Sequence, residues 1–213
     1  MSNCCQCQGI ENTFNAKLAA DDLADYRRDG PSRTTTWLLN ALQAEGVAGM
    51  TLLDVGGGVG AIQLALLQNG VRSVTAVDAS SAYLQAAQQE AERQQVADRI
   101  QYLSGDFVDL SPQLETADIV TLDRVICCYH DMEGLVTEAA AHTDQLLGLI
   151  FPRDRWWLKQ ASRLPNFGLW MMRNPFRIFV HPTTAVEDIL HRYGFQRRYY
   201  DRTWLWQVIL YGK

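Results

Sequence analysis

The chain alternates between two kinds of hydrophobic pattern. Short apolar or β-branched runs bounded by polar or glycine residues predict strands at 50–55, 73–77, 100–103, 117–122 and 146–151. Longer amphipathic stretches predict helices at 10–26, 33–45, 59–68, 80–95 and 133–142. Strands separated by helices of this size indicate βαβ units, and therefore an α/β fold with a mostly parallel sheet.

The C-terminal part departs from this alternation. Two β-prone runs, 196–200 and 203–211, are separated only by Asp201 and Arg202, which predicts a hairpin. Such an antiparallel hairpin would close a doubly wound, seven-stranded sheet. Because no internal repeat or low-complexity linker interrupts the chain, we expect one domain over 1–213. Its expected parts are an N-terminal helical lid (1–48), a cofactor-binding core (49–150), a substrate-cap insertion (151–195) and the closing hairpin (196–213).

Charge and hydropathy narrow the class of protein. The 213 residues carry a net charge of −5, which argues against general nucleic-acid binding. The start, MSNCCQCQGIEN, has neither the basic nor the apolar region of a secretory signal, and no apolar run is long enough to predict a transmembrane helix. The sequence therefore predicts a cytoplasmic protein without a transmembrane segment.

The five cysteines fall into two groups, Cys4, Cys5 and Cys7 at the N-terminus and the adjacent pair Cys127 and Cys128. An odd number in a chain of this kind argues against a disulfide framework, and the spacing is not that of a zinc finger. We therefore expect free thiols and no metal site. The alternative is that the N-terminal cysteines bind a soft metal or metalloid.

The stretch TLLDVGGGVGAIQLALL places glycines directly after a predicted strand. It reads D-x-G-x-G-x-G through Asp54, Gly56, Gly58 and Gly60. Glycines at this position let the backbone turn tightly and approach a ligand. The same stretch satisfies the dinucleotide pattern G-x-G-x-x-A, which ends at Ala61, so two classes of cofactor compete.

Three carboxylates help to separate these two classes. Asp54, before the loop, would repel a pyrophosphate but attract an ammonium group, directly or through water. Asp78 ends the second strand, where it can accept the hydroxyls of a ribose in either class. Asp106 follows the third strand, beside Phe107, where it can accept a proton from the adenine amine. With the terminal hairpin, these features favour S-adenosylmethionine over NAD(P).

Four segments in order, LLDVGGGVG, VTAVDAS, SGDF and DIVTLDRVICCYHD, resemble the class I S-adenosylmethionine-dependent methyltransferases over about residues 33–150. YRRDGPSRTT and LDRVICCYHD more loosely resemble magnesium-protoporphyrin O-methyltransferases. The resemblance implies an enzyme with the Rossmann-like methyltransferase fold and S-adenosylmethionine as cofactor. It implies that the three glycines wrap the amino-acid part of the cofactor. The other implied contacts are Asp78 with Ala79 at the ribose, Asp106 and Phe107 at the adenine, and Asp123 and Arg124 on the methionine side.

The segment after strand four is the expected place of the chemistry. His130 can act as a general base, with Tyr129 beside it, if the acceptor is protonated at neutral pH; a carboxylate acceptor needs no base. The alternative is that His130 only positions other groups or has no role. Arg33 can pair with the cofactor carboxylate, or be a solvated arginine, and Tyr26 in the N-terminal lid is a further candidate for cofactor binding.

Residues 151–182 combine aromatic and basic side chains. Six cations stand against the single acid Asp154, so this segment has a net charge of +5. Three interpretations remain open: a helical cover with aromatics in the core, a lid over an anionic and partly apolar substrate, or peripheral contact with a membrane. Trp156, Trp157 and Trp170 are also suited to a homodimer contact.

The function expected from these features is methyl transfer to a small-molecule acceptor, with apolar bulk and an acidic group, by O-methylation. A metalloid or thiol methyltransferase that uses the cysteines is the alternative within the class. The alternatives of another class are an NAD(P)-dependent oxidoreductase, for which no Tyr-x-x-x-Lys pair is present, and a cofactor-binding regulator without catalysis.

Overall fold

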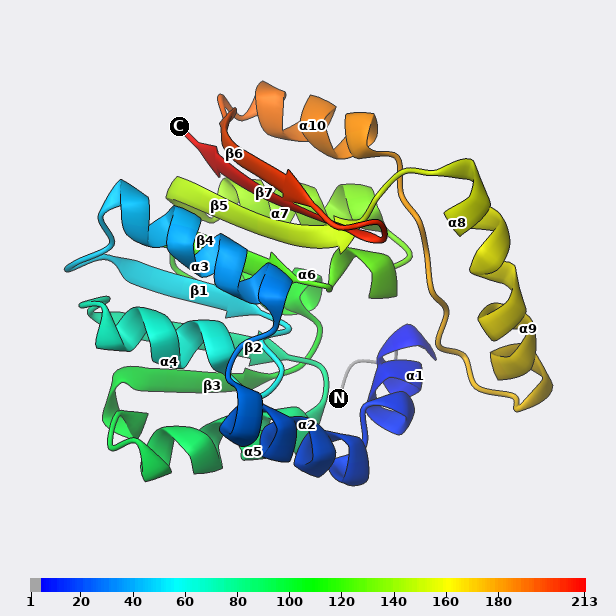
Figure 1. Ribbon diagram of the computed structural model, residues 1–213, viewed down its shortest axis with the longest axis horizontal. Helices are drawn as coiled ribbons and strands as arrows, with labels where there is room; N and C mark the ends of the chain where they lie inside the picture. Colours follow the sequence, from blue (N-terminus) through cyan, green and yellow to red (C-terminus); the bar gives the residue numbers. More distant parts are fainter. Residues whose placement is uncertain (1–4) are drawn as a thin grey trace.

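The computed structural model describes residues 5–213, with side chains from Gly9 onward, and is built on one seven-stranded sheet (Figure 1). The strand order is β3-β2-β1-β4-β5-β7-β6, with β7 antiparallel to both of its neighbours. This confirms the predicted parallel sheet with a closing hairpin. The strands are β1 (Thr51–Val55), β2 (Ser73–Asp78), β3 (Ile100–Ser104), β4 (Ala117–Asp123), β5 (Thr143–Pro152), β6 (Gln196–Arg202) and β7 (Trp206–Gly212).

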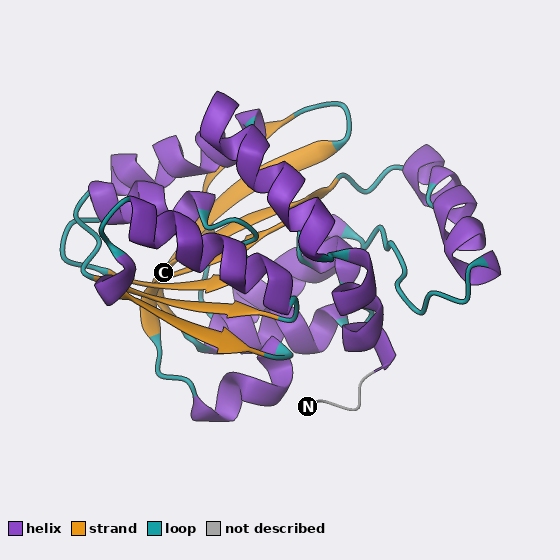
Figure 2. Cartoon of the chain, turned by 90° about the horizontal axis from the view of Figure 1, so that it is seen from below, coloured by secondary structure: helices purple, strands orange, loops and turns teal. Residues whose placement is uncertain are grey.

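Helices cover both faces of the sheet, as the view from below shows (Figure 2). α3, α4 and α5 pack on one face, and α6, α7 and α10 pack on the other. The helices are α1 (Cys5–Thr13), α2 (Ala16–Asp29), α3 (Arg33–Glu45), α4 (Ala61–Gln68), α5 (Ser81–Arg93), α6 (Phe107–Leu110), α7 (Met132–Ala141), α8 (Trp156–Ala161), α9 (Arg163–Met171) and α10 (Thr183–Arg192).

Two hydrophobic cores result from the alternation of side chains along the central strands. In β1, Leu52 packs toward α3 and α4, whereas Leu53 packs toward α7 and α10. In β5, Ile150 belongs to the same core as Leu52, and Leu149 belongs to the same core as Leu53. Strands buried on both faces contain continuous apolar runs, which is why the sequence located them within a few residues.

The structure corrects two of the predicted elements and adds a short helix. The helix expected at 10–26 is two helices, because Asn15 caps α2 by accepting hydrogen bonds from the N–H groups of Lys17 (3.1 Å) and Leu18 (3.2 Å). The last strand begins at Trp206, because the Thr203 hydroxyl accepts the N–H of Trp206 (2.9 Å) in a turn. The short helix α6 was not predicted.

α8 and α9 stand beside the sheet and are attached to it by two extended segments (Figure 1). Trp156 and Trp170 on these helices are largely exposed, so the interpretation of this segment as a cover with its aromatics in the core does not hold for them. α10, by contrast, packs against α7 with Val186 and Leu190 fully buried. Among residues 5–213, no helix is long and apolar enough to cross a membrane.

A large-to-small change in the central sheet tests the assignment of the core. Leu122 in β4 is fully buried, so Leu122→Ala should lower the free energy of unfolding by about 2–5 kcal/mol. The matched variant Leu164→Ala, on the exposed side of α9, should change it by less than about 0.5 kcal/mol. Urea unfolding followed by circular dichroism measures both. Equal losses in the two variants would contradict the packing described here.

Candidate functional site

Two adjoining cavities lie at the carboxyl ends of β1, β2 and β4, where open α/β sheets bind ligands. The first has a volume of about 270 Å³ and the second, which is wider, about 510 Å³. Residues from the glycine loop, α2, α5 and the end of β4 line both cavities. They are Asp22, Gly56, Gly58, Tyr83, Asp123 and Arg124.

The glycine loop connects β1 to α4 and needs glycine for two reasons. Gly56, Gly58 and Gly60 all have positive φ, at 62°, 57° and 82°. At Gly57, a Cβ atom would lie 2.1 Å from Asp54 Oδ2, so a side chain cannot be placed there without displacing that carboxylate. The loop backbone at Gly56 and Gly58 therefore forms a wall of both cavities, whereas Gly60 begins α4 and lines neither.

Asp54 lies beneath the loop, fully buried. Its carboxylate accepts hydrogen bonds from Thr121 Oγ1 (2.6 Å) and Gln63 Nε2 (2.9 Å). Burial raises the pKa of Asp54 to about 6, against the effect of these two bonds. Since Asp54 lines neither cavity, its position favours an effect on a ligand through the loop or a water over direct contact.

Asp78 and Ala79 line the first cavity at the end of β2. The Asp78 carboxylate accepts the N–H of Ser80 at 2.8 Å. Burial raises the pKa of Asp78 to about 6, while hydrogen bonds from the backbone of Ser80 and Gly58 act in the opposite direction. The carboxylate thus joins the start of α5 to the glycine loop.

Asp106 and Phe107 line the same cavity at the start of α6. Asp106 caps that helix by accepting the N–H of Val108 (2.9 Å), and the Tyr129 hydroxyl donates to its two carboxylate oxygens at 2.8 and 2.9 Å. Tyr129, expected at the place of the chemistry, is therefore held beside the residues expected at the adenine. His130 is exposed, stacks on Tyr129 and lines neither cavity.

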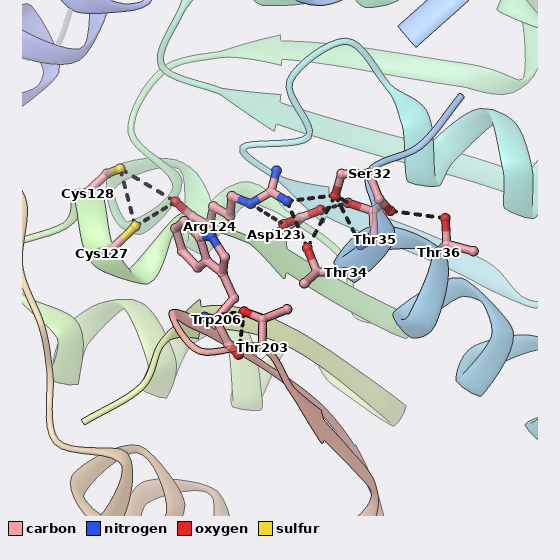
Figure 3. Close-up of polar contacts among 10 residues, drawn as sticks. All are labelled: Ser32, Thr34, Thr35, Thr36, Asp123, Arg124, Cys127, Cys128, Thr203 and Trp206. Carbon is pink, nitrogen blue, oxygen red and sulfur yellow. Dashed lines mark hydrogen bonds and ion pairs between the residues drawn. The ribbon is translucent and has the colours of Figure 1, made fainter. Parts of the chain in front are cut away.

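Arg124 connects three elements at the border of the cavities (Figure 3). One of its terminal nitrogens donates to Ser32 Oγ (2.7 Å) and Thr34 Oγ1 (2.8 Å), at the start of α3. Its guanidinium lies 5.2 Å from the ring centroid of Trp206 in the hairpin. The residue has a φ of 62°, a left-handed conformation that costs free energy outside glycine and is often found at functional sites.

Asp123, the last residue of β4, also lines both cavities. Its Oδ2 accepts the hydroxyl of Thr35 at 2.6 Å, whereas its buried Oδ1 accepts no hydrogen bond from the described residues and lies 3.7 Å from Arg124 Nε. Burial raises the pKa of Asp123. An acceptor oxygen without a hydrogen bond at the border of two cavities is suited to a donor of a bound molecule.

Arg33 and Tyr26 line the second cavity. The Arg33 guanidinium lies 4.7 Å from the ring centroid of Trp37, and burial raises the pKa of Tyr26. The structure thus places eleven of the fourteen predicted site residues on the wall of the first or the second cavity. Two more, Asp54 and Gly60, lie in the same loop region. Tyr129 belongs to the first group, and His130 alone lies outside.

Sequence reasoning missed the contribution of the helices to the cavities. Asp22 of α2 and Tyr83 of α5 line both, and the Tyr83 hydroxyl donates to the Asp22 carboxylate. Ile10 and Phe14 extend the apolar wall of the first cavity. These residues belong to ordinary amphipathic patterns, so no local motif distinguishes them from surface or core positions.

The cysteine pair lies directly after β4. The Sγ atoms of Cys127 and Cys128 are 3.7 Å apart, and each donates to the Arg124 carbonyl, at 3.2 and 3.5 Å (Figure 3). The hydrogen bond with Cys128, together with burial, raises the pKa of the Cys127 thiol. Cys128 lines the first cavity.

The alternative of a metalloid site at the N-terminus lies outside what the structure describes, since Cys4 and the side chains of Cys5 and Cys7 are not among the described residues. Within the described part of the chain, no group of three or more His, Cys, Asp and Glu side chains is arranged to hold a metal ion.

Comparison with known proteins relates this arrangement to an enzyme family. Residues 53–144 match the family model described as "Methyltransferase domain". Ribosomal protein L11 methyltransferase of Alteromonas mediterranea is 32% identical over 123 residues, which cover 55% of this chain and 42% of the relative. The chain spans between 30% and 51% of the length of four curated relatives.

Two solved structures of magnesium protoporphyrin IX methyltransferase from Synechocystis have a similar fold. The structure with bound S-adenosylhomocysteine has a TM-score of 0.73 and 20% identity, covering 96% of this chain and 98% of that chain. The structure with bound S-adenosylmethionine has a TM-score of 0.70 and 18% identity, covering 98% and 97%. Likeness at this identity shows the fold. Together with the match of residues 53–144 to the methyltransferase-domain model, it shows the Rossmann-like fold of the class I methyltransferases.

Proposed function

We propose that the protein transfers a methyl group from S-adenosylmethionine to the oxygen of a small, partly apolar molecule that carries an acidic group. The observation that carries this proposal is the pair of joined cavities. The first offers Asp78 for a ribose and the Asp106–Phe107 segment for an adenine. The second offers the glycine loop, Arg33 and Asp123 for the charged amino-acid part.

Methyl transfer from a sulfonium is an in-line displacement. S-Adenosylmethionine supplies the activated methyl group, so the chain has to align the acceptor and exclude water. The Asp123 Oδ1 atom is suited to the cofactor ammonium, and the Arg33 guanidinium is suited to its carboxylate. The acceptor then approaches from the side on which Arg124 borders both cavities.

The chemistry of the walls supports an acceptor that needs no strong base. No histidine or lysine of the described residues lines either cavity. A carboxylate is already ionised at neutral pH and reacts without general-base catalysis. Ile10, Phe14 and Leu135 provide apolar surface for the rest of such a molecule, and Arg124 provides a cation. His130 is left with a positioning role or none.

The structural neighbour named above supports a small molecule as acceptor, whereas the Alteromonas relative is named for a ribosomal protein. We favour the small molecule because the chain matches the neighbour over nearly its whole length and spans less than half of the relative. The cytoplasmic location, the homodimer and the absence of a nucleic-acid partner stay predictions of the sequence.

One observation favours a second candidate, a thiol or metalloid methyltransferase. Cys128 lines the first cavity, with its sulfur 3.7 Å from that of Cys127. The raised pKa of Cys127 keeps this thiol protonated and therefore poor at binding a soft ion. We rank this candidate second for that reason.

Cofactor binding provides the first test. Calorimetric titration should show binding of S-adenosylmethionine and S-adenosylhomocysteine but not of NADH. Asp78→Asn should weaken the binding of S-adenosylhomocysteine about 10- to 100-fold, because charge-assisted hydrogen bonds to the ribose are lost. The matched variant Asp98→Asn, on the exposed connection before β3, should bind like the wild type. Binding of NADH alone would mean that the glycine loop serves a dinucleotide.

The pH dependence of binding follows from the raised pKa of Asp78. A carboxylate has to be ionised to accept both ribose hydroxyls, so affinity for S-adenosylhomocysteine should fall as the pH decreases below about 6. The decrease approaches about tenfold per pH unit for one proton. Asp78→Asn should flatten this part of the profile. Any remaining slope belongs to Asp54, whose pKa is also about 6, and to Asp123, whose pKa is raised by burial. Parallel profiles for the variant and the wild type would contradict the role of Asp78.

An acceptor panel tests the chemistry of the second substrate. With labelled S-adenosylmethionine, aromatic carboxylates and a protoporphyrin should accept methyl groups, whereas ribosomal protein L11, thiols and arsenite should not. The single variant Cys128→Ser and the double variant Cys127→Ser with Cys128→Ser should retain most of the methyl transfer to carboxylates, because neither sulfur acts on a carboxylate. Activity on arsenite or thiols alone, lost in these variants, would select the second candidate. Cofactor binding without turnover on any acceptor would instead indicate a regulator.

A further inference from the structure

α9 presents its apolar side to solvent. Leu164, Phe167, Trp170 and Met171 recur at the spacing of one helix face, and each is between 58% and 78% exposed. No residue of α9 is buried. An amphipathic helix normally buries this side against its own core, so the outward orientation requires a different explanation.

The exposed apolar surface continues beyond α9. Trp157 of α8 stacks on Trp204 of the hairpin turn, with ring centroids 5.5 Å apart and planes 6° from parallel, which joins the hairpin to the helix pair. We call the combined surface the aromatic face. Its exposed members are Trp156, Leu164, Phe167, Trp170, Met171, Met172 and Trp204.

Cations outnumber acids in the segment that carries most of this face, where Asp154 is the single acid and pairs with Lys159 at 2.6 Å. From Arg155 to Val186 the sequence contains no Asp or Glu. Arg155, Arg163 and Arg173 are exposed and form no ion pair with any residue that the structure describes. Since residues 151–182 carry +5 and the whole chain −5, the remaining residues together carry −10. The segment that carries most of the aromatic face is therefore net positive in a chain that is net negative.

The cofactor cavities do not account for the aromatic face. No residue from 151 to 182 lines either cavity, so the side chains of α8 and α9 form no part of the cavity walls. In Figure 1 the two helices lie at the edge of the molecule, and in Figure 2 the same pair projects from the body of the fold.

We propose that the aromatic face docks on an anionic lipid surface. Tryptophan and methionine side chains enter the boundary between headgroups and acyl chains, with α9 in the plane of that boundary. The arginines at both ends of α9 remain at the level of the anionic headgroups, where each is attracted by the negative surface potential. This docking does not depend on the methyl acceptor.

Vesicle co-sedimentation of the full chain tests the proposal. The protein should bind vesicles of phosphatidylcholine with phosphatidylglycerol, bind phosphatidylcholine alone weakly, and be released by salt. The double variant Trp170→Ser with Arg173→Gln should lose about tenfold or more of its affinity for the anionic vesicles. Tryptophan emission of the wild type should shift to shorter wavelength on binding.

The matched control is Tyr193→Ser with Arg192→Gln, which removes one aromatic ring and one cation at the C-terminal end of α10, the end away from α8 and α9 (Figure 1). It should bind vesicles like the wild type. Binding of S-adenosylhomocysteine by both variants verifies that they are folded. Absence of vesicle binding by the wild type, or equal losses in both variants, overturns the proposal. A second result would also overturn it. If light scattering shows a wild-type dimer that dissociates in the Trp170 and Arg173 variant but not in the control variant, the face is occupied by a second copy.

Discussion

The buried carboxylate of Asp54 is the interaction on which the geometry of the site depends. It accepts hydrogen bonds from Thr121 of β4 and Gln63 of α4, so it fixes two neighbours of β1 where the chain leaves the sheet. Its burial is unfavourable for the ionised form, which the raised pKa shows, and the two hydrogen bonds offset only part of this cost. The contact with Gly57 excludes any side chain beneath the loop. The space beneath the loop is therefore occupied by the Asp54 carboxylate, and the loop backbone faces the cavities.

Arg124 provides a second constraint, at the other border of the cavities. From a left-handed backbone position it reaches Ser32 and Thr34 before and within α3, and its guanidinium lies over Trp206 of β7. These elements come from opposite ends of the chain. One side chain thus connects the N-terminal helices and the C-terminal hairpin to the end of β4. The same guanidinium lies 3.7 Å from Asp123 Oδ1, so Arg124 contacts a carboxylate of the site as well as these hydroxyl groups.

The features that the sequence predicted differ from the features that it missed in one physical respect. The former are determined by neighbouring residues, and the latter by contacts between distant parts of the chain. Leu52 and Leu53 belong to a run buried on both faces, and the glycine loop is specified by neighbouring residues, so both could be recognised locally. The contact of Tyr83 with Asp22 joins two helices far apart in sequence, and no local pattern predicts it. Trp170 fits the same periodicity whether it faces a core or solvent. Periodicity defines a face of a helix, but tertiary packing decides what that face meets.

The segment 172–182 explains how one fold can serve the cavities and the aromatic face separately. Asn174 donates to Thr13 (3.0 Å), and Phe176 packs edge-to-face on Phe14, a residue of the first cavity. Further along, the Phe179 N–H donates to the Cys127 carbonyl, and a His181 ring nitrogen lies 2.9 Å from the Tyr129 carbonyl oxygen. The N-terminal helices and the loop after β4 are therefore connected by this segment and not by α9. Since the large apolar side chains of α9 take no part in these contacts, they can be covered by another surface without displacing the walls of the cofactor site.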